Sequence, residues 1–371
     1  MGDHSVLDAR HSQGSTAWTP PERLGSVTGQ TQAVVAAAGS GAAVVAWTPN
    51  EPGTSQTVEM RYRSSYDTNW GPAATADVGP GHTVSSIRVA IDARGRAYVA
   101  WRGPAGIMLA SRSPSAQGWA AARLAIPDRR PPSSQPGRAL SLAVSSSGVL
   151  ALLWEDHLSG GMQTPARDLL HVRVRSERGT WSPATRIGVE TTPAMQGDAQ
   201  AESPVLSAAF GSSSKLFTTW QAASRAGTAP RVAVLGAGRG WRTARQVTIR
   251  AEGLYPVIAA SARDFAVVLW IATNGAVETA DLTPAGHLTA SRTLGNGQFP
   301  NIVSNEGGDF AAAWGNQAAY RTRKWCKTRS FGQVAESSVA IAPNGAAEML
   351  LQRSNSIFSE RVPACASGGH S

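Results

Sequence analysis

A pattern of about fifty residues recurs seven times along this chain, and a period of that length is typical of folds that stack or radially arrange repeats. Each copy starts with a short apolar strand, turns on Gly, Ser, Asn or Asp, and returns through a second apolar strand. The pattern predicts seven β-hairpins. Six of the second strands end in Trp and the seventh ends in Gln352; the six are Trp47, Trp101, Trp154, Trp220, Trp270 and Trp314.

Two further strands follow most hairpins. The third is more polar than the first two, and the fourth commonly opens with Trp and a Pro or small residue, as at Trp70 and Trp181. Four short strands per repeat are typical of a β-propeller blade. Helical periodicity is absent, and no apolar run is long enough to cross a bilayer. The sequence therefore predicts an all-β fold, a seven-bladed β-propeller with four-stranded antiparallel blades.

The two ends of the chain complement each other. Residues 17–25 read as a fourth strand without the three that should precede it, whereas the seventh hairpin is followed only by a third strand around Ile357. We expect the N-terminal strand to pair with the last blade and close the ring, because closure removes free sheet edges. The expected organisation is one propeller over 17–363, flanked by a polar N-terminal tail (1–16) and a C-terminal tail (364–371).

The chain is basic, with a formal charge of +9. Of its 34 Lys and Arg residues only Lys215, Lys324 and Lys327 are Lys. Spread-out Arg suits anionic partners such as acidic glycans, but Arg in place of Lys with abundant Ala also fits a coding bias. The dense basic clusters with interleaved aromatics that nucleic-acid binding requires are missing. We expect neither a nucleic-acid partner nor a membrane span.

Two cysteines occur late in the chain, Cys326 at the start of a strand and Cys365 in the C-terminal tail. In an exported protein this pair can staple the tail to the preceding blade, with a stabilisation of roughly 3 to 4 kcal/mol; the alternative is two unrelated thiols. The first residues lack the charged and then apolar stretch of a signal peptide. The repeat type and the cysteines still favour an extracellular or cell-surface protein, expected to be a monomer.

The long connections are expected on one face of the propeller. By topology, the second-to-third and fourth-to-first connections share a face, and the three longest connections, 127–138, 155–168 and 188–203, are all of these kinds. The turns of the other face are short, as at Ala93 to Gly95 and at Arg178. Long loops on a rigid scaffold are where binding and catalytic groups usually lie.

These connections carry the candidate site residues. Glu155, Asp156, His157 and Asp168 are candidates for catalysis, because paired carboxylates near a His can support acid/base hydrolysis or a hard-cation site. The candidate binding residues are Arg129, Arg130, Asp156, His157, Asp198 and Glu202.

The alternative is that these polar residues only solvate long loops. The sequence contains no DxDxDG, HExxH, CxxC or GxSxG motif and no phosphate-binding Gly loop. We therefore expect no metal and no cofactor. His82, on the same predicted face, is expected to be a surface histidine.

The recurrent Trp residues have two interpretations. A residue repeated at one position in nearly every blade usually packs adjacent sheets together. A set of aromatic platforms for sugar rings would instead require exposed Trp at the strand ends. We predict packing.

The turns before the fourth strands read SYDTNW (65–70), SAQGW (115–119) and SERGTW (176–181). They resemble degenerate versions of the Asp-box turn of sialidase-like propellers, S-x-D-x-G-x-x-W, although only Asp67 supplies the acid and the Trp comes early. Over 17–363 the chain is similar to the sialidase-like repeat propellers that are found in secreted bacterial proteins. Sialidases have six blades and an early Arg-Ile-Pro element, which is absent here, so the resemblance implies no catalytic residue.

Two functions follow as hypotheses. The first is a secreted propeller that binds glycans or a protein partner through the face with long loops. The alternative is a glycoside-active enzyme, a hydrolase or lyase, that uses the acids around Glu155 to Asp168. Fold alone does not decide between them, because propellers host both.

Overall fold

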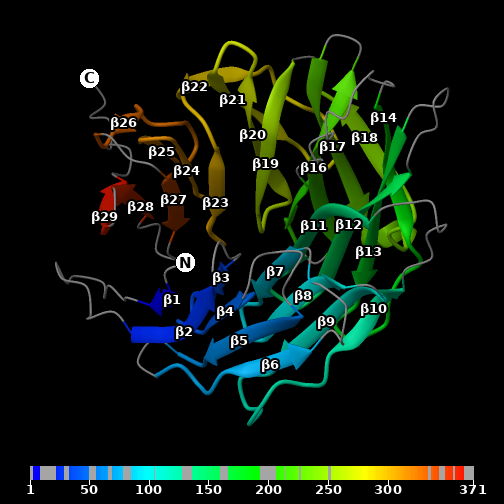
Figure 1. Ribbon diagram of the computed structural model, residues 1–371. Coiled ribbons are helices and arrows are strands. Elements are labelled where there is room, and N and C mark those ends of the chain that lie inside the picture. Colours follow the sequence, from blue (N-terminus) through cyan, green and yellow to red (C-terminus); the bar gives the residue numbers. More distant parts are fainter. Residues whose placement is uncertain are drawn as a thin grey trace. The chain divides into compact units, whose positions relative to one another are not determined.

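The fold is described from a computed structural model (Figure 1). Nearly all of the described residues lie in strands or in the turns between them, and one 3-10 turn, η1 (Ala237–Arg239), is present. The structure describes residues 3–8, 22–28, 33–49, 56–65, 69–77, 84, 86–103, 105–127, 136–158, 166–192, 206–212, 214–224, 227–249, 252–332, 336–341, 347–353 and 356–362.

The chain divides into two compact units, Met1–Pro131 and Pro132–Ser371. The first unit holds one two-stranded sheet and two four-stranded sheets, β3 to β6 and β7 to β10, each with its strands in sequence order. Its strands are β1 (Asp3–Asp8), β2 (Glu22–Thr28), β3 (Ala33–Ala37), β4 (Ala43–Trp47), β5 (Thr57–Arg63), β6 (Ala74–Asp77), β7 (Ser86–Ile91), β8 (Ala97–Gly103), β9 (Gly106–Arg112) and β10 (Arg123–Pro127).

The second unit holds four four-stranded sheets and one three-stranded sheet, again with strands in sequence order. The first two sheets are β11 (Pro136–Val144), β12 (Leu150–Leu158), β13 (Ala166–Arg175), β14 (Thr185–Thr192), and β15 (Leu206–Phe210), β16 (Lys215–Ser224), β17 (Gly227–Gly236), β18 (Ala244–Thr248). The next two are β19 (Gly253–Ser261), β20 (Phe265–Ala272), β21 (Ala276–Leu282), β22 (Arg292–Asn296), and β23 (Asn301–Ser304), β24 (Phe310–Trp314), β25 (Gln317–Arg321), β26 (Arg329–Ser330). The last is β27 (Glu336–Ile341), β28 (Ala347–Arg353) and β29 (Ser356–Val362).

These sheets confirm the all-β prediction and the four-strand repeat in six of the seven copies. The last repeat has three strands within the described residues, as the ending after its third strand predicts. Within the second unit the first strands of consecutive sheets contact one another, β11 with β15, β15 with β19, β19 with β23 and β23 with β27; in the first unit β3 contacts β7. Within each unit, these sheets therefore lie beside one another along their first strands.

The N-terminal segment differs from the prediction in two ways. Residues 3–8, expected in a polar tail, form strand β1, and β2 pairs antiparallel with β1. The reason is tertiary: Val6 packs against the buried cluster that contains Leu24, Val27 and Trp47, a contact that the short apolar pattern of this segment does not indicate. Pairing of β2 with the strand near Ile357 is not among the ladders of the described residues.

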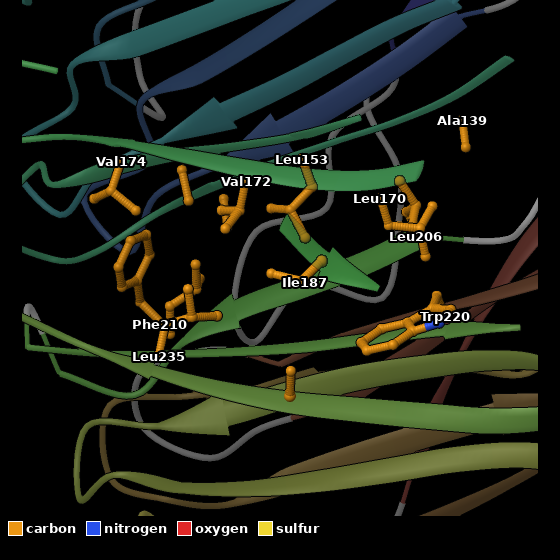
Figure 2. Close-up of a cluster of buried hydrophobic side chains, with 14 of the residues drawn as sticks. Ala139, Leu153, Leu170, Val172, Val174, Ile187, Leu206, Phe210, Trp220 and Leu235 are labelled. Atoms are coloured by element: carbon orange, nitrogen blue, oxygen red, sulfur yellow. The ribbon is translucent and has the colours of Figure 1, made fainter. Parts of the chain in front are cut away.

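The recurrent Trp residues are buried, which confirms their packing role and excludes exposed platforms at these six positions. Figure 2 shows one such core in the second unit, where side chains of β12 to β14 pack against those of the next sheet. Leu153, Leu170 and Ile187 come from one sheet, and Leu206 and Trp220 come from the other. Every second residue of these strands thus faces the neighbouring sheet, because successive side chains of a strand point to opposite faces.

No helix in the described part of the chain is long and apolar enough to cross a membrane.

Candidate functional site

The predicted loop residues Glu155, Asp156, His157 and Asp168 lie on strands. The β12–β13 ladder continues through the pair Leu158 with Arg167, so these residues belong to a regular hairpin. Their placement in a long loop was wrong because hairpin strands can extend with polar residues once the ladder is established. The segment between the two strands, 159–165, lies outside the described residues.

Three of these side chains come together on one face of the sheet. His157 lies directly opposite Asp168 in the ladder, and Nδ1 of His157 is 2.6 Å from Oδ1 of Asp168. Glu155 precedes His157 by two residues on β12 and so lies on the same face. Glu155, His157 and Asp168 each have a ligating atom within 4.8 Å of the others.

The two carboxylates of this group are buried and the imidazole is partly open. Glu155 is 2% exposed, and one of its oxygens accepts a hydrogen bond from the amide of Ala139 at 3.2 Å. The Asp168 side chain is 9% exposed, whereas that of His157 is 26% exposed. Asp168 therefore lies behind an imidazole that reaches solvent, and a carboxylate in this position orients the ring and fixes its tautomer.

A fourth group, Glu190 of β14, completes the set. It lies opposite Asp168 in the β13–β14 ladder. Nε1 of Trp220, from the next sheet, donates a hydrogen bond to Oε1 of Glu190 at 2.7 Å. We call Glu155, His157, Asp168 and Glu190 the carboxylate–histidine cluster. It lies at one end of the apolar layer of Figure 2, on the face to which Leu153 and Leu170 belong.

Burial raises the pKa of Glu190, the hydrogen bond from Trp220 and the charge of Arg231 oppose that rise, and the charge of Asp168 adds to it. Sequence reasoning missed Glu190. The only available signal was its position in the fourth strand after Arg186-Ile187-Gly188, and its approach to Asp168 depends on strand register.

Asp156 does not belong to the cluster. Successive residues of a strand point to opposite faces, so Asp156 lies on the other side of the sheet from Glu155 and His157. There it accepts a hydrogen bond from Nε1 of Trp154 at 3.2 Å and lies 3.5 Å from Nε2 of His171. His171 stacks on Trp154 with ring centroids 5.3 Å apart. The grouping of Asp156 with His157 in one site was therefore wrong.

Burial lowers the pKa of His171, with a smaller lowering from Arg186 and an opposing effect from Asp156. A neutral His171 is thereby favoured between Trp154 and Asp156. The arrangement is a packed polar contact that supports the sheet, and sequence reasoning did not select it.

The remaining predicted site residues lie outside the described residues. These are Arg129, Arg130, Asp198, Glu202 and His82. Cys365 also lies outside, so the predicted disulfide with Cys326 stays a prediction.

The cluster has the residue types of a small cation site, a His and two carboxylates. The distance between His157 and Asp168, 2.6 Å, is that of a strong hydrogen bond. Two ligands of one tetrahedral zinc ion lie farther apart, about 3.3 Å for bonds of about 2 Å. Glu155, His157 and Asp168 could hold a cation only after that hydrogen bond opens, and their present arrangement is that of a hydrogen-bonded pair beside a buried carboxylate.

No family model matches the chain, and no curated protein matches its sequence. AofleA from Arthrobotrys oligospora is 12% identical, over 76% of this chain and 83% of AofleA, with a TM-score of 0.42. The GH93 α-L-arabinofuranosidase of Fusarium graminearum is 11% identical, over 75% of this chain and 92% of that enzyme, with a TM-score of 0.43. A mutant of the NanB sialidase from Streptococcus pneumoniae is 8% identical, over 87% of this chain and 65% of NanB, with a TM-score of 0.44. These values assign no function to this chain.

Proposed function

We propose that this protein is a secreted propeller that binds glycans at the end of sheet β11–β14 that carries the carboxylate–histidine cluster. One observation carries the proposal: His157 is held by a buried Asp168 while its ring stays partly open to solvent. A polar group oriented in this way on a strand costs little further ordering entropy when it binds a ligand hydroxyl.

The chemistry of the cluster suits a sugar better than an anion. Glu155, Asp168 and Glu190 are carboxylic side chains that can accept hydrogen bonds from hydroxyl groups, and His157 can donate or accept. An anionic ligand would have to approach three carboxyl groups. Neutral, hydroxyl-rich ligands are therefore the class proposed here.

A glycan array probed with the purified protein tests this proposal, with His157→Gln as the variant. Gln keeps a polar group beside Asp168 but loses the imidazole, so binding to the glycans recognised by the unchanged protein should weaken about tenfold, the factor that corresponds to about 1.4 kcal/mol. The matched control is His287→Gln, because His287 lies in an exposed turn. Retained binding in His157→Gln contradicts this site.

A second function, glycoside hydrolysis, is favoured by one observation. Burial raises the pKa of Glu190, which lies opposite Asp168, and a carboxyl group with a raised pKa can act as a general acid beside a second carboxyl group. In that case Glu190→Gln should abolish release of nitrophenol from nitrophenyl glycosides while glycan binding persists. Absence of hydrolysis by the unchanged protein leaves binding as the function.

We also propose that the seven repeat sheets, β3–β6 to β27–β29, close into one ring, with β2 as the fourth strand of the last one. The support lies within the first unit. A Cβ built on Gly25 of β2 would clash with the indole of Trp47, and Gly188 of β14 stands in the same relation to Trp220. β2 therefore packs on sheet β3–β6 as β14, the fourth strand of its own sheet, packs on sheet β15–β18. A crystal structure with a different number of sheets or an open ring would contradict closure.

Export and a monomeric state belong to the same proposal. Their support is the repeat type and the pair of late cysteines. Light scattering of the purified protein should give the mass of one chain.

A further inference from the structure

Three aromatic residues of the second unit have a positive φ, Trp241 beside the 3-10 turn η1 and the pair Tyr255 and Phe299, which share one sequence context. Tyr255 has a φ of 51° and Phe299 a φ of 52°. This left-handed region is unfavourable for residues with a bulky side chain and costs of the order of 1–3 kcal/mol at each position. Each residue precedes a proline, in the segments Tyr255-Pro256 and Phe299-Pro300. Such strain persists where the surrounding structure imposes it, and it is concentrated at functional sites.

Each pair forms a bulge opposite a recurrent Trp. On β19, Leu254 pairs with Ile271 and Val257 pairs with Leu269, so Tyr255 and Pro256 together face Trp270. Before β23, the carbonyl of Gln298 accepts a hydrogen bond from the amide of Gly315, and Asn301 pairs with Ala313. Phe299 and Pro300 therefore face Trp314 in the same way. A bulge redirects a side chain relative to the regular strand.

The bulges direct the proline inward and the aromatic ring outward. Pro256 and Pro300 are buried. Phe299 is 62% exposed and Tyr255 is partly exposed. Their ring centroids lie 5.8 Å apart with a 54° angle between the planes, so the two rings form an open, tilted pair. An exposed Phe in a strained backbone gains little from burial and carries the cost of its positive φ.

The aromatic pair is connected to the carboxylate–histidine cluster through the intervening sheet. Trp220 donates to Glu190, and the next residue on β16, Gln221, accepts a hydrogen bond from the amide of Tyr255 at 3.1 Å. Because Trp220 and Gln221 point to opposite faces of β16, one contacts the preceding sheet and the other the following sheet. The cluster and the aromatic pair therefore lie at the same end of consecutive sheets.

We propose that Tyr255 and Phe299 form a platform for the apolar C–H face of a neutral pyranose ring, and that this platform is a second contact point for the glycan. The proposal rests on the proposed function and adds a ligand class and a location to it. Aromatic faces pack against C–H groups with weak but directional attraction, and an exposed pair needs no rearrangement to receive a flat sugar face. Because the sheet β15–β18 lies between the platform and His157, a ligand that contacts both needs more than one sugar residue.

Saturation-transfer NMR with methyl β-D-glucopyranoside and methyl β-D-galactopyranoside tests the platform. We expect transfer from the protein to the ring C–H protons of at least one of the two sugars. Phe299→Asn should reduce this transfer about 3- to 10-fold, because Asn tolerates positive φ but has no ring. Phe299→Trp should retain it. The control is Leu124→Asn, which removes an apolar side chain that is 46% exposed on β10 of the other unit.

The outcomes separate this inference from the proposed function. Equal transfer in the unchanged protein and in Phe299→Asn overturns the platform, and the glycan array with His157→Gln then still tests the cluster. No transfer to either sugar also overturns the platform, while array binding that depends on His157 would leave the proposed function standing. Absence of both transfer and array binding contradicts both. A melting temperature of Phe299→Asn at or above that of the unchanged protein shows that the loss is not caused by unfolding.

Discussion

Gly188 of β14 lies against the indole of Trp220, so close that a Cβ built on this glycine would lie 3.0 Å from Cζ2 of the ring. Gly295 of β22 has the same relation to Trp314, with a Cβ position 3.2 Å from Nε1. In both cases a fourth strand leaves room for the Trp of the next sheet. In these two cases the Trp of one sheet packs against a glycine in the fourth strand of the preceding sheet.

Gly188→Ala should therefore destabilise the protein by about 1–3 kcal/mol, the usual cost of overpacking a filled core. Urea unfolding followed by Trp fluorescence measures it. The control is Gly118→Ala, since a Cβ at Gly118 meets nothing within 4 Å. Equal urea midpoints for the two variants would show that the contact between Gly188 and Trp220 contributes nothing to the free energy of unfolding.

Stability should fall on mild acidification because of His171. Its folded-state pKa lies below the ordinary value of 6.5, so the unfolded chain binds the proton first. The contribution of neutral His171 is complete above about pH 6.5 and is lost as the pH falls from 6.5 through the lowered folded-state pKa. His171→Phe keeps an aromatic ring on Trp154 without a titrating group. We expect its melting temperature to vary less between pH 7 and 5 than that of the unchanged protein, and identical slopes would refute the assignment.

Glu190 should have the opposite pH dependence. Burial raises its folded-state pKa, so its ionisation weakens the folded state above that pKa and the penalty disappears as the pH falls towards the ordinary value of 4.5. Glu190→Gln keeps an oxygen that can accept from Trp220 and has no charge. Thermal scans should show this variant to be more stable at pH 7 and no different below pH 4.5. A variant less stable at pH 7 would mean that the carboxylate is stabilised by Arg231 more than burial penalises it.

Cys326 and Cys365 should form a disulfide when the protein is made in an oxidising compartment. Mass spectrometry of the intact, alkylated protein should show no free thiol, and two alkyl groups should appear only after reduction. Reduction should lower the melting temperature, consistent with a contribution of roughly 3 to 4 kcal/mol from closing this loop in the unfolded chain. Two alkyl groups before reduction would establish separate thiols.

Sequence patterns alone predict the repeat, the four-strand unit and the buried role of the six Trp residues. Each of these depends on short-range information, the two-residue period of strands and the turn residues that bound them. The sequence does not predict strand β1, because its apolar segment is short and flanked by polar residues.

The site was only half predictable for the same reason. His157 and Asp168 were selected from the sequence as polar residues near strand ends, but their contact follows from the β12–β13 register, which extends the hairpin past the expected loop. The alternation of that strand also separates Asp156 from them. Glu190 enters the cluster only through the β13–β14 ladder and the packing of Trp220 from another sheet.

Tyr255 and Phe299 are more than forty residues apart in the sequence, and although they are the two aromatic residues of the chain that precede a proline, that pattern does not indicate that their rings meet. Their left-handed backbone and their ring contact arise from two bulges and from the packing of consecutive sheets. Register, bulges and contacts between sheets are decided by long-range packing, which the order of residues along one strand does not contain.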